Sequence, residues 1–98
     1  MKYFEEYVSK FRGDILSGRF KNILFLGSQA IGKSVSARKL QNESAIPILI
    51  IEDFNPRGNF PKPTIHVTDG EGRYIHIYCA NTISNKRREF FDLIVEAK

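Results

Sequence analysis

The sequence predicts a single α/β domain, residues 1–98, built around a four-stranded mixed sheet. Three observations support this fold class. Apolar runs of strand length alternate with amphipathic segments of helix length, a strand–loop–helix unit lies near the N-terminus, and two alternating stretches flank a glycine turn. The expected element order is α-β-α-β-β-β-α. Ninety-eight residues suffice for one such domain with a modest core.

The N-terminal half predicts a helix followed by a βαβ unit. Apolar residues recur at spacings of three and four within 3–17, which is typical of an amphipathic helix, and Gly18 ends it. Residues 22–26 contain a continuous apolar run and predict a buried strand, followed by a loop and a helix over 31–41. Residues 46–51 predict a second strand, apolar on both faces and therefore central and parallel to the first.

The C-terminal half predicts a β-hairpin and a final helix. Residues 64–69 and 74–79 alternate between apolar and polar side chains around the turn at 70–72. On its polar face, which we expect to be exposed to solvent, this hairpin carries His66, Tyr74, His76 and Tyr78. The spacing over 86–97 predicts the last helix. Its buried side is expected to consist of Phe90, Phe91, Ile94 and Val95.

The order and spacing of these elements resemble the thioredoxin-like fold over most of the chain. Residues 15–26 are similar to the family's first helix, Ser-Gly turn and central strand, and 28–34 fall where the family has its Trp-Cys-Gly-Pro-Cys segment. The resemblance places Ile31 and Ser34 at the two cysteine positions. Pro63-Thr64 resembles the family's Pro-Thr pair before the fourth strand, which implies a cis peptide bond at that proline.

Both redox thiols of that family are missing. Thiol–disulfide exchange needs a thiolate, which neither Ile31 nor Ser34 can supply, and Cys79 is the only cysteine, so we exclude a dithiol oxidoreductase. The resemblance instead implies a redox-inactive binding or regulatory module that needs no cofactor and captures a protein partner, for example a phage-encoded module directed at a host protein. The expected contact surface consists of Ala30, Ile31, Gly32, Lys33, Ser34, Pro63 and Thr64.

The same loop supports a second interpretation. Residues 27–34 match the phosphate-binding pattern Gly-x4-Gly-Lys-Ser, in which backbone N–H groups surround the phosphates, the lysine reaches the terminal phosphates and the serine holds Mg²⁺. The cofactor would then be Mg-ATP or Mg-GTP. The binding residues would be Gly27, Gly32, Lys33, Ser34 and Asp53, with Glu52-Asp53 as the acidic metal partner on the neighbouring strand. We disfavour nucleotide hydrolysis, because the sequence after 53 lacks the crossover helix that a further parallel strand would need.

The remaining signals are weaker. The net charge of +4 and the triplet Lys86-Arg87-Arg88, with the tyrosine face, leave a nucleic-acid-associated role as a third interpretation. We assign no catalytic residue and no metal ligand, since no nucleophile–base pair or carboxylate pair stands out. The single cysteine, the short apolar runs and the lack of a leader pattern favour a cytoplasmic protein that does not enter a membrane.

Overall fold

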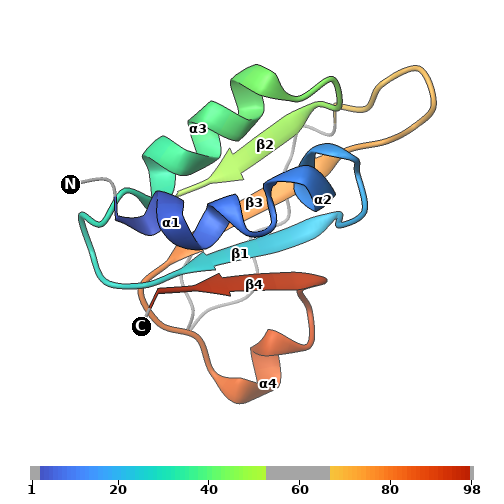
Figure 1. Ribbon diagram of the computed structural model, residues 1–98. Helices are drawn as coiled ribbons and strands as arrows, with labels where there is room; N and C mark the ends of the chain where they lie inside the picture. Colours follow the sequence, from blue (N-terminus) through green and yellow to red (C-terminus); the bar gives the residue numbers. More distant parts are fainter. Residues whose placement is uncertain (1–2, 53–66, 98) are drawn as a thin grey trace.

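The computed structural model describes residues 3–52 and 67–97, which form a four-stranded parallel sheet flanked by helices (Figure 1). The strands are β1 (Asn22–Leu26), β2 (Ile48–Ile51), β3 (Ile75–Ala80) and β4 (Leu93–Glu96). The helices are α1 (Phe4–Ser9), α2 (Arg12–Leu16), α3 (Lys33–Glu43) and α4 (Asn85–Arg88). The strand order is β2-β3-β1-β4. The predicted α/β class is therefore confirmed for the described chain.

β1 lies inside the sheet, between β3 and β4, and is buried on both faces. Successive side chains of a strand point to opposite faces. Accordingly, Ile23 and Phe25 join one hydrophobic cluster, whereas Leu24 and Leu26 join another. The predicted buried strand over 22–26 is confirmed with the same bounds.

The first cluster lies under α1, α2 and α3, which pack on one face of the sheet (Figure 1). Phe4 of α1 contacts Phe25 of β1, with ring centroids 5.1 Å apart, and Ile15 and Leu40 are buried beside them. The single helix predicted over 3–17 is in fact two short helices. Phe11, between them, leaves the helical backbone region (φ −114°, ψ 2°) and packs against this cluster.

The second cluster covers the opposite face of the sheet with aromatic rings. Tyr78 of β3 lies 5.3 Å from Phe91 and 5.9 Å from Phe90, ring centroid to ring centroid, and both contacts are edge-to-face. Edge-to-face packing places the positive edge of one ring against the negative face of another. The segment that carries α4 is therefore anchored by the two phenylalanines that follow the helix.

The helix predicted over 86–97 is wrong. Only Asn85–Arg88 is helical, and Leu93–Glu96 is β4, which pairs in parallel with β1. The spacing of Phe90, Phe91, Ile94 and Val95 fits a helix as well as it fits a turn followed by a strand. In β4, Ile94 joins the aromatic cluster and Val95 joins the helix-covered cluster, as strand alternation requires.

The predicted mixed sheet is not borne out, because every strand pair among the described residues is parallel. The strand predicted over 46–51 also lies in a different place. β2 is an edge strand that pairs with β3 rather than with β1, and its last three residues are only half-buried. β3 takes the central position instead, with all six of its residues buried.

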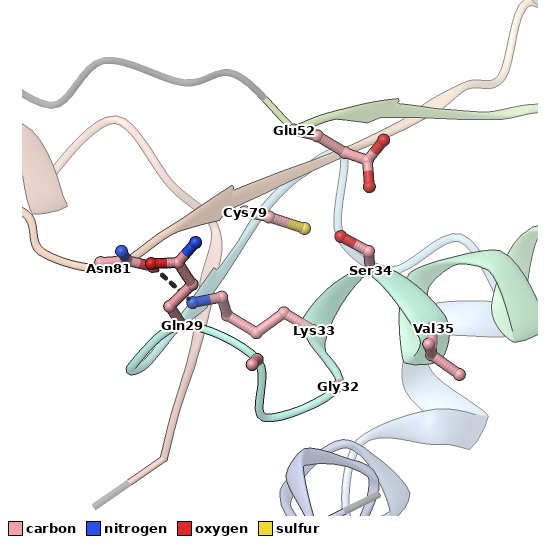
Figure 2. A pocket seen from close by; sticks show the side chains of 9 residues that line it. Gln29, Gly32, Lys33, Ser34, Val35, Glu52, Cys79 and Asn81 are labelled. Atoms are coloured by element: carbon pink, nitrogen blue, oxygen red, sulfur yellow. Dashed lines mark hydrogen bonds between the residues drawn. The ribbon is translucent and has the colours of Figure 1, made fainter. Parts of the chain in front are cut away.

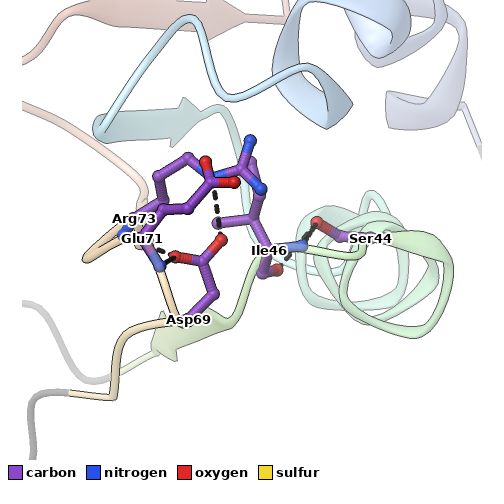
Figure 3. Close-up of polar contacts among 5 residues, drawn as sticks. All are labelled: Ser44, Ile46, Asp69, Glu71 and Arg73. Atoms are coloured by element: carbon purple, nitrogen blue, oxygen red, sulfur yellow. Dashed lines mark hydrogen bonds and ion pairs between the residues drawn. The ribbon is translucent and has the colours of Figure 1, made fainter.

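The glycine turn predicted at 70–72 is present, but residues 67–69 before it are not in a strand. Asp69 organises this turn (Figure 3): its carboxylate accepts the N–H groups of Glu71 and Arg73 at 2.9 and 2.8 Å, and pairs with the Arg73 side chain at 2.7 Å. The prediction that the polar face of the hairpin is exposed to solvent is wrong for His76 and Tyr78, because both are buried. Residues 64–66, with His66, lie outside the described residues, as does the expected cis bond at Pro63.

Candidate functional site

A pocket of about 550 Å³ opens at the carboxyl end of the sheet, where β1, β2 and β3 end (Figure 2). All strands run in the same direction, so the residues that follow them gather at one edge. The loop between β1 and α3 forms one wall. The pocket is lined by Gln29, Ala30, Gly32, Lys33, Ser34, Val35, Glu52, Cys79 and Asn81.

The shape of the loop depends on its two glycines and on Ile31. The Gly27 N–H donates to the Ala80 carbonyl at 3.2 Å, and a Cβ on Gly27 would lie only 2.5 Å from Cδ1 of Ile31. Ile31 turns inward, with 8% of its surface exposed, and its carbonyl accepts the N–H of Phe4 at 3.0 Å. Gly32 has φ +97° at the start of α3, a conformation that glycine adopts without strain.

Lys33 is the charged group at the centre of the site. It is 8% exposed, and its Nζ donates to the carbonyls of Gly27 and Ser28 and, at 2.8 Å, to Oδ1 of Asn81. These three acceptors are neutral. Burial lowers the pKa of Lys33 below its ordinary value.

The N-terminus of α3 adds positive potential beside this ammonium group. The first N–H groups of a helix have no partner within the helix. Gly32, at the N-cap, has no side chain to accept from them, and the first turn contains no acidic residue. The partial charge of the helix N-terminus therefore adds to that of Lys33.

The side chains of Ser34 and Cys79 point toward each other in the pocket (Figure 2). Burial, and after it the nearby Glu52 carboxylate, raises the pKa of the Cys79 thiol to about 11, although Lys33 and a hydrogen bond with Ser34 act in the opposite direction. The thiol is therefore protonated at neutral pH and is a weak nucleophile.

Glu52 follows β2, and its carboxylate pairs with Arg38 of α3 at 3.3 Å. It was predicted on a strand next to β1, but β3 lies between the two strands. The strand that does adjoin β1 is β3, and the residue directly after β3 is Asn81, an amide and not a carboxylate. Asp53, the other predicted acidic partner, lies outside the described residues.

Four of the residues predicted for a protein-binding surface line the pocket, namely Ala30, Gly32, Lys33 and Ser34. Ala30 has a positive φ of +64°. Ile31 is buried against Gly27, so it does not contribute an exposed apolar strip. Pro63 and Thr64 lie outside the described residues.

The basic triplet does not join the tyrosines in one continuous surface. Lys86, Arg87 and Arg88 belong to the short α4, and Arg88 pairs with Glu96 of β4 at 3.3 Å. Tyr78 is 2% exposed and packs on the phenylalanines, so it offers no stacking face. The burial of Tyr78 therefore removes one of the two tyrosines on which the nucleic-acid interpretation depended.

The sequence interpretation missed four of the pocket residues: Gln29, Val35, Cys79 and Asn81. Cys79 and Asn81 are the two outside the loop and α3. They lie at and just after the end of β3, which the predicted hairpin placed elsewhere. The signal was Asn81, a polar residue directly after the strand-like run Ile75 to Ala80, since ligands of parallel sheets bind at the carboxyl ends of strands.

Comparisons with protein-family models, with curated proteins and with solved structures gave no match. Within residues 3–52 and 67–97, no group of three or more His, Cys, Asp or Glu side chains is arranged to hold a metal ion. No helix in that part of the chain is long and apolar enough to cross a membrane. The function is therefore inferred from the site itself.

Proposed function

We propose that the protein binds a phosphate group through residues 27–34, as carried by inorganic phosphate or by a nucleotide such as ATP or GTP. The observation that carries this proposal is the environment of Lys33. The buried Nζ of Lys33 lies at the pocket and is held by neutral oxygens, so none of these three acceptors offsets its positive charge. An anion in the pocket would supply the missing negative charge.

Each part of the loop has a role in this proposal. Lys33 provides the charge, the uncapped N–H groups at the start of α3 provide hydrogen-bond donors, and the Ser34 hydroxyl lines the same pocket. Gly27 and Gly32 let the backbone curve closely around the ligand. The parallel sheet adds support, because a loop between a parallel strand and the following helix is where such sheets bind phosphates.

The proposal concerns binding and not hydrolysis. Phosphoryl transfer to water needs a group that orients the attacking water and a positive charge on the departing phosphate. Arg38, the arginine of α3, is already paired with Glu52. Of the acidic and thiol groups that line the pocket in the described chain, Glu52 holds this ion pair and Cys79 is protonated, so neither is a free base.

A redox-inactive thioredoxin-like module that captures a protein partner stays the second candidate. It is favoured by the loop's position after β1 and by the exposed backbone around Ala30. The burial of Ile31 weakens it, because the apolar contact that this hypothesis requires is already made inside the protein.

The test is an amide-resolved NMR titration of the full chain with inorganic phosphate, MgATP and MgGTP, each to millimolar concentration. We expect shifts concentrated in residues 27–35 with at least one of these ligands. Lys33→Met, which keeps the aliphatic stem and removes the charge, should abolish them. Lys86→Met removes the same charge from the exposed α4 and serves as the matched control.

Shifts that survive in Lys33→Met, or a silent loop with all three ligands, would refute the phosphate proposal. Shifts around Lys86 that fall steeply with salt would favour the nucleic-acid interpretation instead.

A further inference from the structure

The three acceptors around Lys33 distinguish this pocket from a site built for a metal–phosphate complex. A bound divalent cation in a phosphate site is held by protein oxygen ligands, of which at least one is normally a carboxylate. After β3, the strand beside the loop strand β1, the side chain facing Lys33 is the amide of Asn81, at 2.8 Å. An amide leaves the lysine charge uncancelled and gives a cation much weaker attraction than a carboxylate does.

The carboxylate that does line the pocket is that of Glu52. Glu52 follows β2, not the strand beside β1, and lies on the Ser34 side of the pocket (Figure 2). It is already paired with Arg38 at 3.3 Å. Coordination of a metal by Glu52 would leave this guanidinium without the ion pair that it makes among the described residues.

We propose that the pocket takes its phosphate ligand as the free anion, without a divalent cation. This inference rests on the proposed function. The protein's own positive charge, from Lys33 and the N-terminus of α3, balances the ligand, and Asn81 keeps that charge available. A cation bound to the ligand cancels part of its negative charge and so weakens its attraction to the site.

The test is calorimetric titration of the wild-type chain with sodium pyrophosphate, once in EDTA and once in excess Mg²⁺. We expect binding in EDTA that is at least as tight as in Mg²⁺. Binding that is tighter in Mg²⁺ by about tenfold or more, a difference of about 1.4 kcal/mol, would overturn the inference and leave the proposed function standing. Absence of binding under both conditions would overturn the proposed function as well.

A pair of charge variants provides an independent test. Asn81→Asp places a carboxylate on Lys33 and should weaken pyrophosphate binding in EDTA on the order of tenfold. Asn42→Asp adds the same charge at the exposed far end of α3, about 14 Å along the helix from Lys33, and should bind as the wild type does. Wild-type affinity in a folded Asn81→Asp chain would contradict the inference. If that variant does not fold, the comparison of EDTA with Mg²⁺ decides it.

Discussion

Gly27 has no side chain, so the side chain of Ile31 in the same loop can pack directly against its backbone. Ile31 occupies the space that a Cβ would need, and Ala97 lies on the other side of the same position. The close approach buries Ile31 and turns the following residues toward the pocket. The packing of Ile31 thus holds the loop on the protein, while Gln29, Ala30 and Gly32 of the same loop line the pocket.

Gly27→Ala should lower the free energy of unfolding by about 1–3 kcal/mol, because its Cβ would lie 2.5 Å from Cδ1 of Ile31. Urea denaturation measures the loss. Ile31→Val removes that Cδ1, so the double variant should be less destabilised than the sum of the two single variants. Gly70→Ala is the control, since nothing lies within 4 Å of the added Cβ. Additive effects of the two changes would show that the contact is not the cause.

Cys79 makes stability depend on pH in the alkaline range. Its pKa is raised by burial from 9.0 to about 11, so the folded chain holds the thiol proton more tightly than the unfolded chain does. The resulting stabilisation is complete below about pH 9 and is lost as the pH rises through about 11, by at most about 3 kcal/mol.

The measurement is urea denaturation of wild type and Cys79→Ala at pH 8, 10 and 11. The variant lacks the titrating thiol, so the difference in stability between the two proteins should shrink as the pH rises. A constant difference would mean that the thiol titrates alike in the folded and unfolded chains.

At the scale of elements, β4 shows how a long-range contact decides local structure. The Asp92 carboxylate accepts the backbone N–H groups of both Lys21 and Asn22 at 3.0 Å, so it fixes the end of the chain against the start of β1. The Asp92 N–H donates in turn to the Asn22 carbonyl at 2.8 Å. These bonds hold the following residues in an extended conformation beside β1.

Asp92→Ala should therefore destabilise the protein by about 1–3 kcal/mol, because two backbone donors lose a charged acceptor. Asp92→Asn keeps an oxygen acceptor and should cost less. Glu89→Ala, which removes a nearby exposed carboxylate, should change stability by less than about 0.5 kcal/mol. Thermal or urea denaturation checks all three. An Asp92→Ala chain as stable as the Glu89→Ala chain would contradict this role.

The elements that could be predicted from the sequence are those that local patterns determine. β1 and the loop after it have their own hydrophobic run and glycine spacing, so their bounds and the candidate residues Gly27, Gly32, Lys33 and Ser34 emerge from the sequence alone. The order of the strands does not, because it depends on contacts between distant segments. Asn81 was missed for the same reason: its place beside Lys33 follows from the parallel pairing of β3 with β1.

At the scale of the whole molecule, the two faces of the sheet are covered in different ways. α1, α2 and α3 lie on one face, tied together by ion pairs between Lys39 and Glu5 and between Arg12 and Glu43. On the other face, Tyr78, Phe90 and Phe91 cover the neighbouring strands with aromatic rings. The loop of residues 27–32 joins the sheet to the helices on its first face. It connects β1 to α3, and the Ile31 carbonyl accepts a hydrogen bond from Phe4, the first residue of α1.

The position of β1 inside the sheet also has a consequence for synthesis. Both neighbours of β1 come from the last quarter of the chain, and Asn22 bonds to a residue 70 positions later. β1 is made early on the ribosome and therefore stays unpaired until the residues of β3 and β4 have been synthesised. Contacts at such sequence separation slow folding. A chain that ends before β3 would keep both edges of β1 open, and such unpaired apolar edges are prone to aggregation.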